Sequence, residues 1–311
     1  MIPHYFNLIL TVALSLITLL AAGFDNNVVS FTVLFVVVVS ILRTLMTSTQ
    51  EKREPTTPFT IVVLTFFTIF SLISISWSLD PSRTAIEGWQ LVLCTLLLLN
   101  VMTMDQTSIS QFFRISIFTA AAITVFSFSI YLTLSATRIS GTFTNPNPFA
   151  TYIAMFAFLM TGWHLERPHW GKLALGVLFT TALILTGSRG AFVSAVVASL
   201  FLWFPSQGKP VLKRITGTAV IVVLALLFTQ LMIWAAPIIQ ETTRPSAELV
   251  QMILRPQSFG GSTEGRFAFW EAGIRAGLQK PLTGHGLGTF FLAYYLEAPG
   301  DRWRSEERRV G

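Results

Sequence analysis

Long apolar runs, separated by short polar segments, are the feature that most restricts how this chain can fold. An α-helix needs roughly 20 apolar residues to cross the hydrocarbon core of a membrane. The runs lie at residues 5–22, 28–46, 59–77, 88–104, 112–134, 148–165, 170–185, 188–204 and 215–238. None alternates strictly between apolar and polar residues, which disfavours a transmembrane β-barrel. The sequence therefore predicts an all-α, polytopic membrane helix bundle of about nine transmembrane helices over residues 1–239. A partly helical extracytoplasmic segment is predicted over residues 240–311.

Composition supports this class and restricts the chemistry. The chain is 52% hydrophobic and 12% charged, whereas a soluble domain is about a quarter charged. Its single cysteine, Cys94, lies in an apolar run, so no disulfide framework forms within the chain and we interpret Cys94 as a packing residue. The four histidines have no metal-ligand spacing, so the sequence predicts no metal site, and we expect no cofactor.

The positions of the basic residues predict the orientation in the membrane. If the N-terminus is inside, most basic residues outside the tail fall in inner connections: Arg43, Lys52, Arg53, Arg114, Arg167, Lys172, Lys209, Lys213 and Arg214. The short outer connections then hold Arg83, Arg138 and Arg189. This is the bias of the positive-inside rule. It also explains the net charge of +6 without a nucleic-acid partner. Residues after 239 are then predicted to lie outside.

Two polar turns on the predicted outer face precede helices. Asn147 can cap a helix with Pro148 in its first turn, and Ser188 can cap a helix with Arg189 in its first turn. A helix N-terminus carries about half a positive charge and unpaired N–H groups, which suit phosphate. Arginine also binds phosphate oxygens bidentately. Each turn could instead be only a tight hairpin, but together they favour an anion site that also includes Arg138.

The tail contributes further candidates. A helix is predicted over residues 266–279, with apolar residues along one face, and Arg266 at its start could extend over the anion site. The helix is too short to span a membrane, so we expect it to lie on the membrane surface or to cap the bundle. A shorter amphipathic helix is predicted near residues 246–254. The glycine-rich stretch 284–288 lacks the preceding β-strand of a dinucleotide loop, so we interpret it as a tight turn. His285 within it is a candidate base, although an isolated histidine between glycines more often has a structural role.

Four segments of the chain resemble, in order, those of one protein family. They are SWSLDP (76–81), GTFTNPN (141–147), TGSRG (186–190) and a Gly-Arg pair (265–266) that leads through Trp270 to PLTGHG (281–286). With them the chain resembles the O-antigen ligase and O-antigen polymerase family of bacterial inner-membrane glycosyltransferases.

The resemblance implies transfer of a glycan from undecaprenyl diphosphate to an acceptor on the periplasmic face of the inner membrane. The acceptor is the lipid A-core in ligases, another lipid-linked repeat in polymerases, and a protein hydroxyl in related oligosaccharyltransferases. The family's arginines, matched here by Arg189 and Arg266, hold the donor diphosphate, and the reaction needs no metal. The family continues further, with a histidine proposed as general base. We therefore expect this chain to be a C-terminally truncated, inactive form, with a non-native end over residues 304–311.

Two hypotheses of other classes remain open. One is a transporter for an anionic solute, and the other is a sensor or structural membrane protein whose outer helices bind a partner. A transporter should have a polar path across the bilayer. The glycosyltransferase hypothesis instead requires Arg189 and Arg266 to face one outer cavity, with Arg138 nearby.

Overall fold

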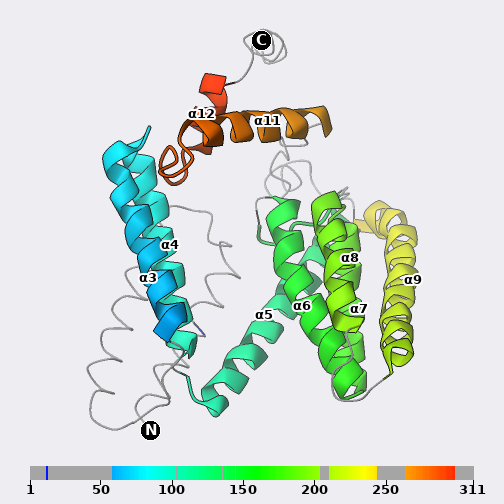
Figure 1. Ribbon diagram of the computed structural model, residues 1–311. Helices are drawn as coiled ribbons and strands as arrows, with labels where there is room; N and C mark the ends of the chain where they lie inside the picture. The colour runs from blue at the N-terminus through cyan, green and yellow to red at the C-terminus, as the bar shows by residue number, and fades with distance from the viewer. Residues whose placement is uncertain are drawn as a thin grey trace. The chain divides into compact units, whose positions relative to one another are not determined.

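The computed structural model describes residues 58–102, 104–134, 138–143, 145–203, 210–243 and 263–297, together with positions 12 and 136. All regular structure in this part of the chain is helical, which confirms the all-α class for it (Figure 1). The helices are α3 (Pro58–Ile73), the short 3-10 helix η1 (Ser74–Trp77), α4 (Pro81–Met102), α5 (Gln106–Thr133), α6 (Pro146–Glu166), α7 (Trp170–Leu185), α8 (Arg189–Trp203), α9 (Val211–Thr243), α11 (Thr263–Gln279) and α12 (Phe290–Glu297).

Every apolar run from residue 59 onward corresponds to a helix. The runs at 5–22 and 28–46, the predicted helix at 246–254 and the stretch 304–311 lie outside the described residues. Among the described helices, α4, α5 and α9 are long and apolar enough to cross a membrane, whereas α7 and α8 are shorter apolar helices. Membrane-type helices are therefore present, and the nine-span topology and its orientation stay predictions.

Two helices begin well before the apolar runs that predicted them, because each starts with a polar turn. α4 begins at Pro81, and the Asp80 carboxylate accepts the backbone N–H of Arg83 at 3.0 Å. α5 begins at Gln106, directly after Asp105. The Ser108 hydroxyl, followed by backbone N–H groups, holds the pKa of Asp105 below its usual value. Capping carboxylates thus extend both helices beyond their apolar parts.

The described residues form two compact units. One combines the α3–α4 hairpin with α11 and α12, and the other contains α5, from Ser110 onward, to α9. The predicted division of the chain at residue 239 is a different, topological boundary and stays a prediction.

The core of the α5–α9 unit is centred on α6 and α7. Phe149 and Ile153 of α6 and Phe179 of α7 are fully buried there, and Ile123 of α5 joins them. The buried Thr181 hydroxyl of α7 donates a hydrogen bond to the Ala225 carbonyl of α9 at 3.2 Å. Hydrogen bonds between helices are typical of membrane bundles, where burial of apolar surface does not drive helices together.

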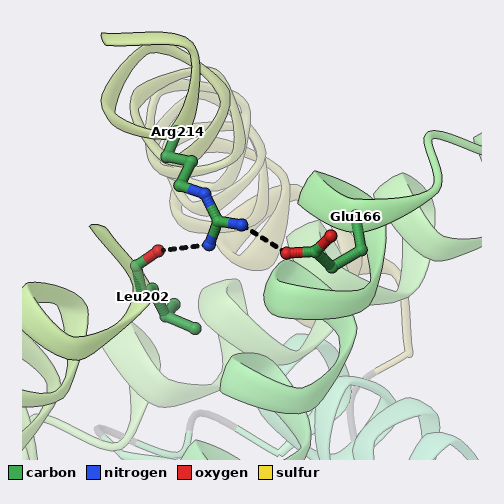
Figure 2. Close-up of polar contacts among 3 residues, drawn as sticks. All are labelled: Glu166, Leu202 and Arg214. Carbon is green, nitrogen blue, oxygen red and sulfur yellow. Dashed lines mark hydrogen bonds and ion pairs between the residues drawn. The ribbon is translucent and has the colours of Figure 1, made fainter. Parts of the chain in front are cut away.

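At the end of this unit where α6 ends, an ion pair and a hydrogen bond from one arginine connect α6, α8 and α9. Arg214 of α9, which is 6% exposed, binds the carboxylate of Glu166 at the end of α6. It also donates to the Leu202 carbonyl near the end of α8 at 3.0 Å (Figure 2). The last carbonyls of a helix carry partial negative charge, so a cation there is stabilising. From the sequence, Arg214 was predicted only to be one of the basic residues of an inner connection. Its contacts were not predicted, because Glu166 lies 48 positions and Leu202 lies 12 positions away in the chain.

We expect Glu166→Gln to lower the free energy of unfolding by about 2 kcal/mol, because it leaves the Arg214 cation buried without its counter-charge. The value is set below that of a fully buried pair because the Glu166 side chain is 31% exposed. Thermal unfolding in detergent measures the effect. Glu271→Gln is the matched control, because its pair with Arg275 is exposed on both sides and should contribute under about 0.5 kcal/mol. Equal losses in the two variants would contradict the role of Arg214.

Candidate functional site

The turn between α7 and α8 is built from its own polar groups. Thr186 is fully buried, and its hydroxyl donates to the Leu183 carbonyl at 2.7 Å. The same oxygen accepts the backbone N–H of Ser188 at 3.3 Å. Gly187 follows with a φ of +60°, a conformation that glycine adopts without steric cost. The turn therefore reverses the chain within a few residues and starts α8 at a defined point.

Arg189 is the first residue of α8 and is exposed. Ser188 precedes it and is buried, and its Oγ lies 3.5 Å from the backbone nitrogen of Ala191, in the position of the predicted N-cap. This geometry places a guanidinium at a helix N-terminus, where backbone N–H groups and the helix dipole also favour an anion.

The prediction that Asn147 caps α6 was wrong, because the helix begins one residue earlier than Asn147. Asn145 is the N-cap, and its side chain accepts the backbone N–H of Asn147 at 2.8 Å. Pro146 then occupies the first helical position, where the missing N–H costs nothing. The Asn147 side chain is in the first turn and makes a different contact.

That contact is with Arg138, which joins the two turns. Its Nη2 donates to Asn147 Oδ1 at 3.3 Å, and its Nε donates to the Thr186 carbonyl at 2.5 Å. The neighbouring backbone N–H of Ile139 donates to the Leu185 carbonyl at 3.3 Å. The structure thus brings Arg138, Asn147 and the turn that carries Ser188 and Arg189 to one end of the α5–α9 unit.

The other two segments singled out in the sequence meet in the other unit. The Trp77 indole donates to the Thr283 carbonyl at 3.1 Å. The Leu79 backbone N–H donates to the His285 carbonyl at 3.0 Å, and the Thr84 hydroxyl donates to the Leu287 carbonyl at 2.8 Å. The SWSLDP segment and the start of α4 therefore form a docking surface for the glycine-rich loop that follows α11.

This docking requires glycine in the loop, where the positive φ values confirm the predicted tight turn. Gly286 has a φ of +102°, and a Cβ there would lie 2.3 Å from Ser78 Oγ. Gly288 has a φ of +75°, and a Cβ there would lie 2.4 Å from Glu87 Cγ. Sequence reasoning identified the glycines but missed their partners, which are about 200 residues away in the chain.

The His285 ring points back to α11. Its Nε2 lies 3.0 Å from the Ala276 carbonyl, and because a carbonyl only accepts, this nitrogen carries the hydrogen. Its Nδ1 is buried, without a hydrogen-bond partner among the described residues. The ring therefore ties the loop to α11, a geometry that favours a structural role over that of a base.

Arg266 lies in α11, which begins three residues before the predicted start. The position of its side chain is outside what the structure describes, and Arg266 belongs to a different unit from Arg189. The convergence of these two arginines stays a prediction. Four apolar side chains of α11 are exposed, as expected for a helix on a membrane surface or against another part of the protein: Phe267, Trp270, Ile274 and Leu278.

These features define a class: a helical membrane protein with a cation-bearing turn at one end of its bundle. In the parts of the chain that the structure describes, no three His, Cys, Asp or Glu residues are grouped to bind a metal.

A family model described as O-antigen ligase matches residues 174–309, which include the TGSRG turn and the PLTGHG loop. Residues 174–309 are therefore similar to the O-antigen ligase family, which supports the resemblance seen in the sequence. No curated protein and no solved structure matches the chain.

Proposed function

We propose that the protein transfers a glycan from undecaprenyl diphosphate to the lipid A-core, on the periplasmic face of the bacterial inner membrane. The observation that carries this proposal is the exposed Arg189 at the N-terminus of α8, inside the region matched by the O-antigen ligase model. The match by itself supports ligase- or polymerase-type activity. The donor, the acceptor and the membrane face are our proposals.

The chemistry explains why cations at a helix N-terminus suit this reaction. The bond between the anomeric carbon and the diphosphate oxygen breaks, and its electron pair stays on the diphosphate. An acceptor hydroxyl forms the new bond to the anomeric carbon and loses its proton to a base. Negative charge therefore grows on the leaving diphosphate, and preorganised donors there contribute about 3–4 kcal/mol each to transition-state stabilisation.

We assign the donor diphosphate to Arg189 and the N-terminal N–H groups of α8, with Arg266 as the second cation. Ser188 supports this site by capping α8. The general base that takes the proton of the acceptor hydroxyl is not assigned to a residue. His285 remains a candidate, but its Nε2 hydrogen is directed at the Ala276 carbonyl. The family's proposed histidine is the alternative.

Deletion of the gene followed by analysis of the lipopolysaccharide tests the proposal. Loss of a ligase should leave complete glycan on its lipid carrier and lipid A-core without attached polymer. Loss of a polymerase, the alternative within the family, should leave single repeats on the core. An unchanged lipopolysaccharide would overturn the ligase proposal and would favour a protein acceptor or the transporter hypothesis, which the family match does not support.

A further inference from the structure

Arg138 was predicted as a ligand of the diphosphate, and its geometry indicates a different role. The guanidinium has a side-on edge, formed by Nε and Nη2, that can hold two oxygens of a phosphate at once. In the structure two protein oxygens occupy this edge, the Thr186 carbonyl at 2.5 Å and Asn147 Oδ1 at 3.3 Å. This edge cannot bind phosphate while both contacts persist.

The two oxygens belong to the two segments that form the candidate site. Thr186 is the C-cap of α7, and its carbonyl is one of those that a helix end leaves without an intrahelical partner. Asn147 is in the first turn of α6. Since partial negative charge gathers at a helix C-terminus, the Arg138 cation is favourable there. Arg138 thus satisfies the end of α7 and connects it to the start of α6.

Gly187 makes the approach of Arg138 possible. A Cβ built on Gly187 would lie 3.2 Å from Arg138 Nε, 3.8 Å from Cδ and 3.9 Å from Cγ. The side chain therefore lies along the backbone of the residue that separates Thr186 from Ser188. Gly187 directly precedes Ser188, the residue in the N-cap position of α8, and Arg189 follows it.

We propose that Arg138 is a positioning residue. It holds the turn at residues 186–188 against the first turn of α6, and so sets where the N-terminus of α8 presents Arg189. The effect on transfer rests on the proposed function, whereas the effect on the turn does not.

The test uses the full chain in phospholipid nanodiscs, with Arg138→Met, Arg138→Lys and, as the matched variant, Arg189→Met. Amide hydrogen exchange without donor lipid reports on residues 183–192, and α9 serves as the internal reference. Transfer from a synthetic undecaprenyl diphosphate-linked glycan is measured in the same preparations.

Arg138→Met should raise exchange in the turn about tenfold, the effect expected when hydrogen bonds from a charged donor are lost, and α9 should be unaffected. Arg138→Lys keeps the charge and one donor, so it should restore part of both protection and transfer. Arg189→Met should leave exchange unchanged and abolish transfer.

Unchanged exchange in Arg138→Met would overturn the proposal, as would a rise that includes α9. Loss of transfer in Arg138→Met with normal protection of the turn would make Arg138 a ligand and would also overturn it. Full transfer in Arg189→Met, with a loosened turn in Arg138→Met, would instead refute the proposed function and leave the positioning role intact.

Discussion

Arg189→Lys is expected to reduce glycan transfer by at least about 100-fold, the scale at which removal of one preorganised donor slows a reaction. Lysine keeps the charge, but its ammonium is a point donor, whereas the planar guanidinium binds two phosphate oxygens at once. Arg189 is exposed at the first residue of α8, so the exchange should leave packing intact. Transfer is measured in two membrane preparations, one with the variant and one with the wild type, at equal amounts of protein.

Two controls accompany this variant. Arg114→Lys makes the same exchange at another exposed arginine, near the start of α5, and should retain full transfer. Cys94→Ala should also retain it. The free Cys94 thiol is exposed on α4, so it is not the packing residue that the sequence suggested, and we assign it no role in the reaction. Full activity of Arg189→Lys would remove Arg189 from the donor site, and loss of activity in Cys94→Ala at normal expression would contradict our interpretation of that residue.

Gly286→Ala is expected to displace the glycine-rich loop from the α3–α4 hairpin. A new Cβ would lie 2.3 Å from Ser78 Oγ, 2.6 Å from Ser78 Cβ and 2.9 Å from Thr84 Oγ1, all of them in the docking surface. Positive φ adds about 1–2 kcal/mol for a residue with a side chain, and forced overpacking adds about 1–3 kcal/mol. The backbone N–H of Leu79 should then lose its partner, the His285 carbonyl, and exchange faster.

Gly284→Ala is the matched control for Gly286→Ala. Gly284 also has positive φ, +64°, but a Cβ there meets nothing within 4 Å. Gly284→Ala should therefore have the conformational cost of a positive φ without a steric clash. Ser78→Gly in the Gly286→Ala background removes two of the three close atoms, Ser78 Oγ and Ser78 Cβ, and should recover part of the loss. Equal effects of the two alanine variants would show that docking on Ser78 does not constrain the loop.

Local patterns explain what could be predicted. The apolar runs predicted each described membrane-type helix, and the run at 170–185 matches α7 from end to end. The predicted starts of α4 and α5 were less accurate. Each helix begins with a polar turn after Asp80 or Asp105, and a search for apolar runs does not include such a turn. At α6 the prediction placed the cap at Asn147, whereas Asn145 caps the helix. Either asparagine side chain can accept a backbone N–H, so residue type alone does not separate them.

The candidate site was only partly predictable for a related reason. Residue type and position made Arg138, Asn147, Ser188 and Arg189 candidates. For the two arginines the reason is that a cation at the mouth of a membrane helix is costly to desolvate unless a partner or an anion faces it. From the sequence, Arg138 and Arg189 were both predicted to bind the diphosphate. The directions of their side chains, one along Gly187 and the other exposed, distinguish them, and no pattern in the sequence encodes those directions.

The sequence by itself determined the all-helical class with membrane-type helices, and it singled out the short polar segments that we propose for the chemistry. Both follow from interactions between residues within a few positions of each other, which leave a readable pattern. Tertiary structure alone decided that Arg138 joins α6 to the α7–α8 turn and that the SWSLDP segment receives a loop from the end of the chain. The Trp77–Thr283 bond spans 206 positions and the Arg138–Thr186 bond spans 48. Contacts at such separations depend on how helices pack, so they become visible only when the chain is folded.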